Sequence, residues 1–291
     1  MLSFEYLRPE TLDDALAILA EHGPAARLLA GGTDLLVRLR LGHIRPAVVV
    51  DLKHVAAIRA DVIDIEGGVR VGARAVMTDL IEDPRIRRHF PALVEAASVV
   101  GSVQIRNRAT LAGNICNASP AADTAPPLLV FGARVNMISA AGARQVPVAD
   151  FFVGPGKTIL GRGELVESID LPVPDGPTGA AFGRVTRRKG VDLATINLCC
   201  LVSQSGKARF AYGAVGPRPF VVDDDTGVLG APASDARAIT AAIDRLVAAA
   251  RPISDVRGSQ EYRTAMLDVM TRRTWAIAMR RLRGTDPRAS P

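Results

Sequence analysis

Two segments of small residues in this chain have the composition of a backbone cradle for an anionic ligand. The first is Leu29-Ala30-Gly31-Gly32-Thr33-Asp34, which we expect to connect a short strand to a helix that begins at Leu35. Such a turn presents free amide groups at the positive end of a helix dipole, and glycine has no Cβ to hinder an approaching phosphate. A Gly-Gly pair also forms simple tight turns, and no G-x-G-x-x-G fingerprint follows a strand in this sequence.

The second segment runs from residue 106 to residue 126 and reads RNRATLAGNICNASPAADTAP. Small side chains bury little apolar area, so packing alone is a poor reason for so long a run. Thr110 and Ser119 offer hydroxyls, Gly113 and Asn114 tolerate close approach or left-handed geometry, and Asp123 accepts hydrogen bonds from hydroxyl groups. One reading is the second side of the same cradle. The other is a long surface loop, although loops of this length without a function are uncommon.

Periodicity and turn residues predict an α+β chain around these segments. Thr11 is expected to cap a first helix that Gly23-Pro24 ends, and residues 172–177 are the best linker between two halves. Further helices are expected at 35–40, from Asp79 after a Thr78 cap, at 90–100, 233–250 and 260–283. Strands are expected at 27–30, 47–51, 62–65, 69–71, 134–139, 164–171, 180–188, 193–202 and 208–215.

Composition argues against several classes of protein. The net charge is +6 and the pI about 9.7, but the basic residues are scattered and only 4% of residues are aromatic, so nucleic-acid binding is not expected. No apolar run reaches the roughly 20 residues of a membrane span, and the N-terminus has no apolar signal core. The three cysteines form neither a disulfide framework nor a CxxC pair. We therefore expect a cytoplasmic protein without a metal site of its own.

The two segments resemble a known pair of motifs. LLAGGTDLL and RNRATLAGNICNASPAAD are similar to the two flavin-binding signatures of the FAD subunit in the xanthine dehydrogenase and carbon monoxide dehydrogenase family of molybdenum hydroxylases. The resemblance extends to FEYLRPETLDDALAIL near the N-terminus, to GAVGPRPF from Gly213 to Phe220 and to DVRGSQEYR from Asp255 to Arg263. It covers nearly the whole chain with the motifs in the family's order, so the match is specific.

The resemblance implies an FAD-binding fold of the vanillyl-alcohol-oxidase (PCMH) type over residues 1–175, in two subdomains at about 1–55 and 56–175. A C-terminal α+β domain of the CO-dehydrogenase flavoprotein type would then cover residues 178–288. Both parts agree with the α+β pattern that periodicity predicts.

The resemblance also assigns cofactor contacts. Residues 30–34 would wrap the FAD pyrophosphate with backbone amides, and Thr110 with the backbone of 111–114 would meet it from the opposite subdomain. Ser119 and Asp123 would hold ribityl or ribose hydroxyls, and Arg184 would contact the cofactor near the flavin ring. The expected cofactor-binding residues are Leu29, Ala30, Gly31, Gly32, Thr33, Asp34, Thr110, Leu111, Ala112, Gly113, Asn114, Ser119, Asp123 and Arg184.

The sequence departs from the family at a few positions. Relatives often have Gly-Gly where this chain has Ala112-Gly113, so the close approach is expected at Gly113, and φ of Ala112 must be negative. The cysteine-rich insert of the hydroxybenzoyl-CoA reductase branch is not found in this sequence. Cys116 lies inside the second signature, and we interpret it as a small packing residue.

The function implied is electron transfer rather than acid–base catalysis, so no catalytic residue is assigned. A large partner subunit would carry the molybdenum cofactor, a small partner would carry two 2Fe–2S clusters, and the complex would be a dimer of heterotrimers. FAD in this chain would pass electrons to NAD⁺, a quinone or O₂. The four histidines would be solvated or structural. The basic residues of the last helix are either a solvated face or a docking surface for a partner, namely Arg272, Arg273, Arg280, Arg281 and Arg283.

Two alternatives stay open at this point. One is a self-contained FAD reductase or oxidase of the same fold, such as the UDP-sugar reductases, which needs a catalytic acid that the sequence does not reveal. The other is a non-catalytic nucleotide-binding or assembly module. The sequence specifies neither the substrate of the complex nor its electron acceptor.

Overall fold

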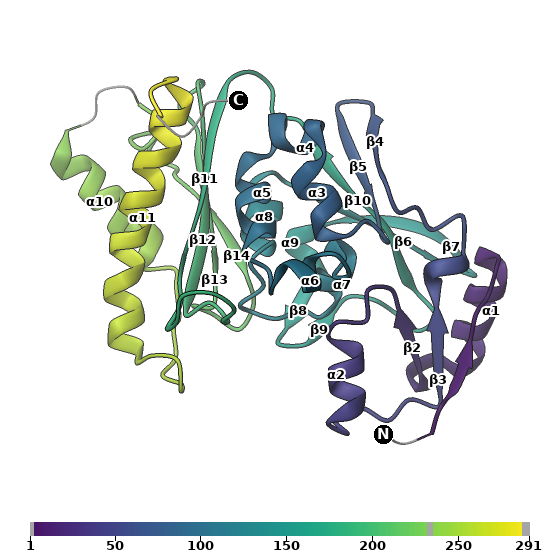
Figure 1. Ribbon diagram of the computed structural model, residues 1–291. Helices are drawn as coiled ribbons and strands as arrows, with labels where there is room; N and C mark the ends of the chain where they lie inside the picture. The colour runs from purple at the N-terminus through teal and green to yellow at the C-terminus, as the bar shows by residue number, and fades with distance from the viewer. Residues whose placement is uncertain (1–2, 232–234, 287–291) are drawn as a thin grey trace.

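The chain begins with a three-stranded parallel sheet of order β1-β3-β2, here called the N-terminal sheet, with helix α1 packed beside it (Figure 1). The structure is a computed structural model that describes residues 3–231 and 235–286. The Thr11 hydroxyl accepts a hydrogen bond from the Asp14 amide at 3.1 Å, and Gly23 ends the helix at φ +50°, as predicted. The elements are β1 (Glu5–Leu7), α1 (Leu12–His22), β2 (Ala26–Leu29), α2 (Leu35–Arg40) and β3 (Val48–Asp51), with 3-10 turns at Gly23–Ala25 and Leu52–His54.

The middle sheet has five antiparallel strands in the order β4-β5-β10-β6-β7. Strand β10 pairs with both β5 and β6, so it returns the chain to the centre of the sheet. The strands are β4 (Val62–Ile65), β5 (Gly68–Gly72), β6 (Arg134–Ser139), β7 (Gly142–Pro147) and β10 (Leu165–Pro172), with a small hairpin of β8 (Phe152–Gly154) and β9 (Lys157–Thr158). The helices of this part are α3 (Met77–Glu82), α4 (Pro84–His89), α5 (Pro91–Ser98), α6 (Val103–Arg106), α7 (Leu111–Cys116), α8 (Ala125–Val130) and α9 (Val148–Phe151).

The run of small residues between 106 and 126 is not a surface loop. It forms α7 and leads directly into α8, and every residue from 121 to 130 is buried. Small side chains are therefore needed because this backbone is enclosed, with α8 packed between the middle sheet and the C-terminal strands (Figure 1). The alternative reading of this segment as a long surface loop is wrong.

The last part of the chain is a four-stranded antiparallel sheet, the C-terminal sheet, with helices on both faces (Figure 1). Side chains alternate along β12, so Cys199 joins the core with α5 and α8, whereas Cys200 faces α10 and α11. Among the described residues, no helix is long and apolar enough to cross a membrane. The elements are β11 (Thr178–Val185), β12 (Ile196–Ser203), β13 (Ala208–Gly213), β14 (Phe220–Asp223), α10 (Ala236–Val247) and α11 (Gln260–Leu282).

Helix α11 lies unusually close to strand β11 because two glycines face it. A Cβ at Gly179 would overlap the carbonyl oxygen of Ala278, and a Cβ at Gly183 would lie 2.7 Å from the Thr274 hydroxyl. The buried stripe of α11 combines apolar and polar residues at helical spacing, including Arg263, Leu267, Thr271, Thr274 and Ala278.

Some predicted elements differ from the structure. Helix α3 begins at Met77, not at Asp79, because the Asp79 carboxylate accepts a hydrogen bond from the Val76 amide at 3.0 Å and extends the helix upstream of Thr78. Helix α4, capped by Asp83, was not predicted. Residues 233 and 234 of the predicted helix 233–250 lie outside the described residues, as do residues 1 and 2 and the predicted domain end at 288.

The basic residues of α11 do not share one solvated face. Arg272 pairs with Asp268 on the same helix at 2.9 Å, and Arg281 pairs with Glu95 of α5. Arg273 and Arg280 are exposed. Part of this basic stretch therefore fastens the chain internally, and only the exposed part is available to a partner.

Candidate cofactor site

The two small-residue segments meet although they come from different sheets. Gly31 lies so close to the second segment that a Cβ there would overlap the carbonyl oxygen of Arg108. The two segments are also joined by Asn117, which donates a hydrogen bond from Nδ2 to Asp34 Oδ1 at 3.4 Å. The expectation that the two segments converge is therefore met in their geometry.

The first segment supplies a row of free backbone donors. Leu29 ends strand β2 opposite Asp51, Ala30 leaves the sheet, and α2 begins five residues later at Leu35. Within residues 3–231 and 235–286, the amides of residues 31–34 donate to no acceptor. Gly32 has φ +77°, a left-handed conformation that favours glycine. Asp34 directly precedes α2, but its carboxylate does not cap the helix.

The second segment supplies the N-terminal turn of α7. The Thr110 hydroxyl accepts a hydrogen bond from the Gly113 amide at 2.9 Å, so it caps the helix. Leu111 and Ala112 are buried, whereas Gly113 is exposed, and φ of Ala112 is not positive, as the sequence required. A Cβ at Gly113 would meet only the Thr110 hydroxyl, 2.8 Å away. Asn114 turns inward and accepts a hydrogen bond from the Thr124 hydroxyl at 2.7 Å.

The region after α7 connects this site to the C-terminal sheet. Ser119 accepts a hydrogen bond from the Ala121 amide at 3.2 Å. Asp123 is buried, and its two oxygens bind Arg184 Nη1 at 2.7 Å and Asn197 Nδ2 at 2.9 Å. Asp123 and Arg184, which the sequence nominated as separate cofactor contacts, are thus partners of each other.

Burial raises the pKa of two ionisable side chains in this region, Asp123 and Cys116. Burial raises the pKa of Asp123, while the hydrogen bond from Asn197 and the charge of Arg184 oppose that rise. Burial also raises the pKa of the Cys116 thiol to about 12, which favours the protonated thiol near neutral pH. The interpretation of Cys116 as a packing residue agrees with this environment.

Several residues at the site were not found from the sequence. Asn117 and Arg108 join the two segments, and Asn197 joins Asp123 to strand β12. Arg184 also donates to the carbonyl oxygen of Val99 at 3.2 Å, which ties the end of α5 to the same cluster. Asn117 and Arg108 lie within the quoted second motif, but only their spatial contacts give them a role.

The arrangement fits a diphosphate between two backbone segments. The first segment offers four free amides, and the second offers an exposed glycine in the first turn of a helix. Backbone amides bind phosphate oxygens well, and the side chains of residues 30–33 are small. The residues present therefore fit the pyrophosphate of an FAD molecule, and the buried cluster of Asp123, Arg184 and Asn197 joins the end of the second segment to the C-terminal sheet.

A separate pocket of about 440 Å³ lies between α10 and α11 and shares no residue with the cradle. Its lining is mostly apolar, and its two carboxylates, Asp244 and Asp268, both pair with Arg272. It offers no row of free donors for a phosphate, so the cradle is the better cofactor site.

Comparison with known proteins agrees with this geometry. Residues 2–174 match the family described as FAD binding domain in molybdopterin dehydrogenase, and residues 181–278 match the CO dehydrogenase flavoprotein C-terminal domain. The chain is 33% identical to the xanthine dehydrogenase FAD-binding subunit of Escherichia coli O157:H7 over 279 residues, which cover 94% of this chain and 95% of that protein. It is 32% identical to the carbon monoxide dehydrogenase medium chain of Hydrogenophaga pseudoflava, covering 96% and 98%.

The fold agrees as well. A solved structure described as reconstituted CO dehydrogenase from Oligotropha carboxidovorans superposes with a TM-score of 0.90 at 30% identity, covering 97% of this chain and 100% of that one. The predicted fold class, an FAD-binding domain followed by a CO-dehydrogenase flavoprotein domain, is confirmed. The chain therefore belongs to the FAD-binding subunits of the xanthine dehydrogenase and carbon monoxide dehydrogenase family, and it is an FAD-dependent oxidoreductase subunit of that family.

Proposed function

We propose that this chain is the FAD-carrying electron-transfer subunit of a molybdenum hydroxylase. The observation that carries the proposal is the row of free amides at residues 31–34 in a segment that contacts Arg108 and Asn117, the residues on either side of α7. Bound FAD would accept electrons singly from an iron–sulfur donor and release them in pairs to NAD⁺, a quinone or O₂. The chain itself binds and orients the cofactor and needs no general acid or base.

The proposed contacts follow the geometry. The amides of residues 31–34, after Leu29 and Ala30, would hold pyrophosphate oxygens, and Gly32 and Gly113 would let them approach the backbone. Thr110 would act by capping α7, which keeps the Leu111–Asn114 turn in place. Ser119 would bind a sugar or ribityl hydroxyl. Asp123 would do so with lone pairs that its bonds to Arg184 and Asn197 leave over.

The proposed partners are a large molybdopterin-binding subunit and a small subunit with two 2Fe–2S clusters, assembled as a dimer of heterotrimers in the cytoplasm. Support comes from the relatives' names, which include medium chains of carbon monoxide dehydrogenase and glyceraldehyde dehydrogenase. We further propose domain boundaries of 1–175 and 178–288, with the first domain divided near residue 55. The short segment between β10 and β11 supports the division after 175.

The test is direct binding of FAD to the purified chain, followed by the flavin absorption spectrum and the melting temperature. Gly32→Val and Gly113→Val are expected to weaken FAD binding. Gly67→Val is the matched control, because Gly67 also has positive φ, at +69°, but lies in the β4–β5 hairpin with no atom near its absent Cβ. If the chain binds no FAD alone or with co-expressed partners, or if the control loses FAD equally, the proposal is wrong.

A further inference from the structure

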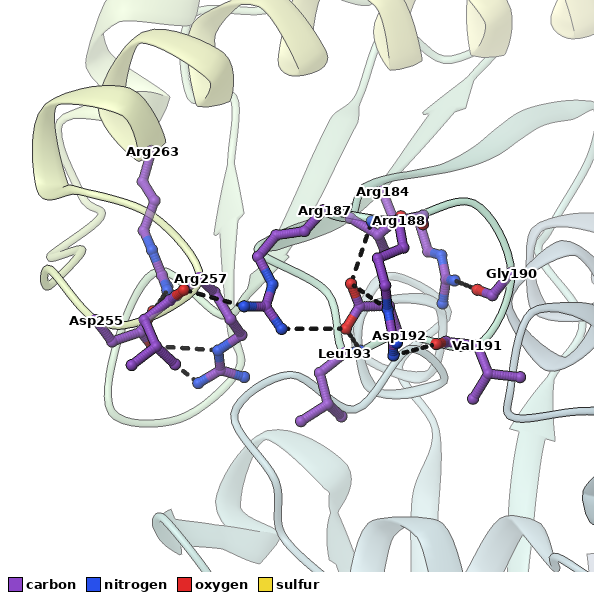
Figure 2. A network of polar contacts seen from close by, with 12 residues as sticks. Arg184, Arg187, Arg188, Gly190, Val191, Asp192, Leu193, Asp255, Arg257 and Arg263 are labelled. Atoms are coloured by element: carbon purple, nitrogen blue, oxygen red, sulfur yellow. Dashed lines mark hydrogen bonds and ion pairs between the residues drawn. The ribbon is translucent and has the colours of Figure 1, made fainter.

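A buried arginine in the C-terminal part is connected through one residue, Ala214, to the segment that contains Ser119 and Asp123. Arg263, in the first turn of α11, is only 2% exposed. Its Nη1 donates to the carbonyl oxygen of Ala214 at 2.6 Å, and its Nη2 binds Asp255 Oδ1 at 2.6 Å (Figure 2 shows Arg263 above Asp255). Burying a cation is costly unless it is paired with an anion and hydrogen-bonded. The contacts with Asp255 and Ala214 supply that ion pair and one such hydrogen bond, so we ask what the bond to Ala214 holds in place.

The first contact ends on a residue with a strained backbone. Ala214 has φ +60°, and among the described non-glycine residues only Ala118 shares a positive φ. L-residues avoid this conformation unless their surroundings enforce it. The hydrogen bond from the Arg263 guanidinium to the Ala214 carbonyl oxygen is a contact that can hold Ala214 in this conformation.

The amide group of Ala214 faces the segment that contains Ser119 and Asp123. Its amide donates to the carbonyl oxygen of Pro120 at 2.7 Å, and its side chain packs against Ala121 and Ala194. Pro120 lies between Ser119 and Asp123, the two residues proposed to hold cofactor hydroxyls. A continuous series of contacts therefore runs from Asp255 through Arg263 and Ala214 to Pro120, the residue after Ser119.

We propose that Arg263 is a positioning residue for the cofactor: by holding Ala214 in its left-handed conformation, it fixes Pro120 and thereby the placement of Ser119 and Asp123 against FAD. The inference rests on the proposed function and deepens it. It assigns a role to two motifs, GAVGPRPF and DVRGSQEYR, which otherwise lie outside the cradle.

The neighbouring Arg257 provides a matched control. It also binds Asp255, at 2.9 Å, and Figure 2 shows it beside the same carboxylate. Its side chain is 28% exposed, against 3% for Arg263, and no hydrogen bond from it to Ala214 is found in the described residues. Loss of Arg257 removes a comparable charge pair without touching the cradle.

The experiment measures FAD affinity, visible circular dichroism of the bound flavin and unfolding of the FAD-free chain for the wild type and four variants. Arg263→Met is expected to weaken FAD binding about tenfold or more and to change the flavin dichroism, because Ala214 relaxes to negative φ. Adding Ala214→Gly is expected to restore most of that loss, since glycine keeps a positive φ without help. Ala214→Gly alone and Arg257→Met are expected to stay within about twofold of wild-type affinity.

The binding and dichroism measurements separate positioning from a merely structural role. If Arg263 only stabilised the fold, Arg263→Met would lower the free energy of unfolding of the FAD-free chain, whereas the folded variant would keep wild-type FAD affinity and flavin dichroism. The inference is overturned if folded Arg263→Met binds FAD with wild-type affinity and dichroism, or if Ala214→Gly gives no recovery. If Arg263→Met does not fold, Arg263→Lys is measured instead. Weaker FAD binding by Arg263→Lys, restored in the double variant with Ala214→Gly, supports the inference. Unchanged FAD binding by Arg263→Lys overturns it. A wild-type chain that binds no FAD overturns the proposed function itself.

Discussion

Asp123 and Arg184 form a buried ion pair that joins the segment before α8 to strand β11, with 2.7 Å between Oδ2 and Nη1 and about nine-tenths of each side chain buried. The pair is 61 residues apart in sequence, and Asn197 from strand β12 completes it. The segment that carries Ser119 and Asp123 is thus joined directly to the C-terminal sheet.

Removing one member of this pair should cost far more than removing a surface pair. Arg184→Met should lower the free energy of unfolding by about 3 kcal/mol, because it leaves a buried carboxylate without its cation. The double variant Asp123→Leu/Arg184→Met should recover part of the loss. Urea unfolding of the FAD-free chain measures the stability of both variants. Arg209→Met is the control, because the side chains of Arg209 and Asp223 are 41% and 60% exposed and their pair should contribute less than about 1 kcal/mol. Equal costs for Arg184→Met and Arg209→Met would contradict the interpretation.

Gly31→Ala should separate the two sides of the cradle. The new methyl group would overlap the carbonyl oxygen of Arg108, and backbone cannot move aside as a flexible side chain can. We expect a destabilisation of about 1–3 kcal/mol from overpacking, together with loss of FAD binding. Isothermal titration with FAD checks this, and Gly67→Ala should retain FAD affinity because the space around that glycine is open. Wild-type affinity in Gly31→Ala would show that the two segments move independently.

The acid stability of the chain should depend on Asp255. Burial favours protonation, but the Arg257 amide and the guanidinium groups of Arg257 and Arg263 outweigh it and hold the pKa at about 2. A carboxylate with a lowered pKa stabilises the fold above its unfolded pKa, near 3.9, and loses that contribution as pH falls towards 2. The stability difference between wild type and Asp255→Asn should therefore approach about 2 kcal/mol near pH 6 and shrink between about pH 4 and 2. Denaturant unfolding at a series of pH values measures it, and a pH-independent difference would refute the assignment.

Local chemistry made much of the fold predictable. The Thr11 cap, the glycine that ends α1 and strand β6 all depend on neighbours within a few residues, so the sequence reveals them. Strand β7 was missed because nearly all its residues are exposed, so its pattern does not alternate. Helix α7 was missed because Gly113 and Asn114 disfavour helices, and the Thr110 cap with surrounding packing overrides that preference.

The sequence proposes the candidate site as a list of residues, and the structure adds their arrangement. Residues 30–34 and 110–114 follow from composition and family motifs, whereas the pairing of Asp123 with Arg184 depends on how β11 packs beside α8. Contacts across 49 residues, such as Arg263 with Ala214, leave no local pattern. A motif such as DVRGSQEYR therefore indicates the family without revealing what its charged residues do.

Arg281 should hold α11 against the FAD-binding part. Its Nη2 binds Glu95 of α5, its Nη1 donates to the Ala180 carbonyl oxygen at 2.6 Å, and Glu95 in turn accepts from the Phe182 amide at 2.9 Å. Arg281→Met should lower the free energy of unfolding by about 3 kcal/mol, because it breaks a largely buried network while the acidic partner remains. Arg280→Met, next in sequence but exposed, should change stability by less than about 0.5 kcal/mol. Chemical unfolding compares the two, and equal effects would mean that α11 is held by apolar packing alone.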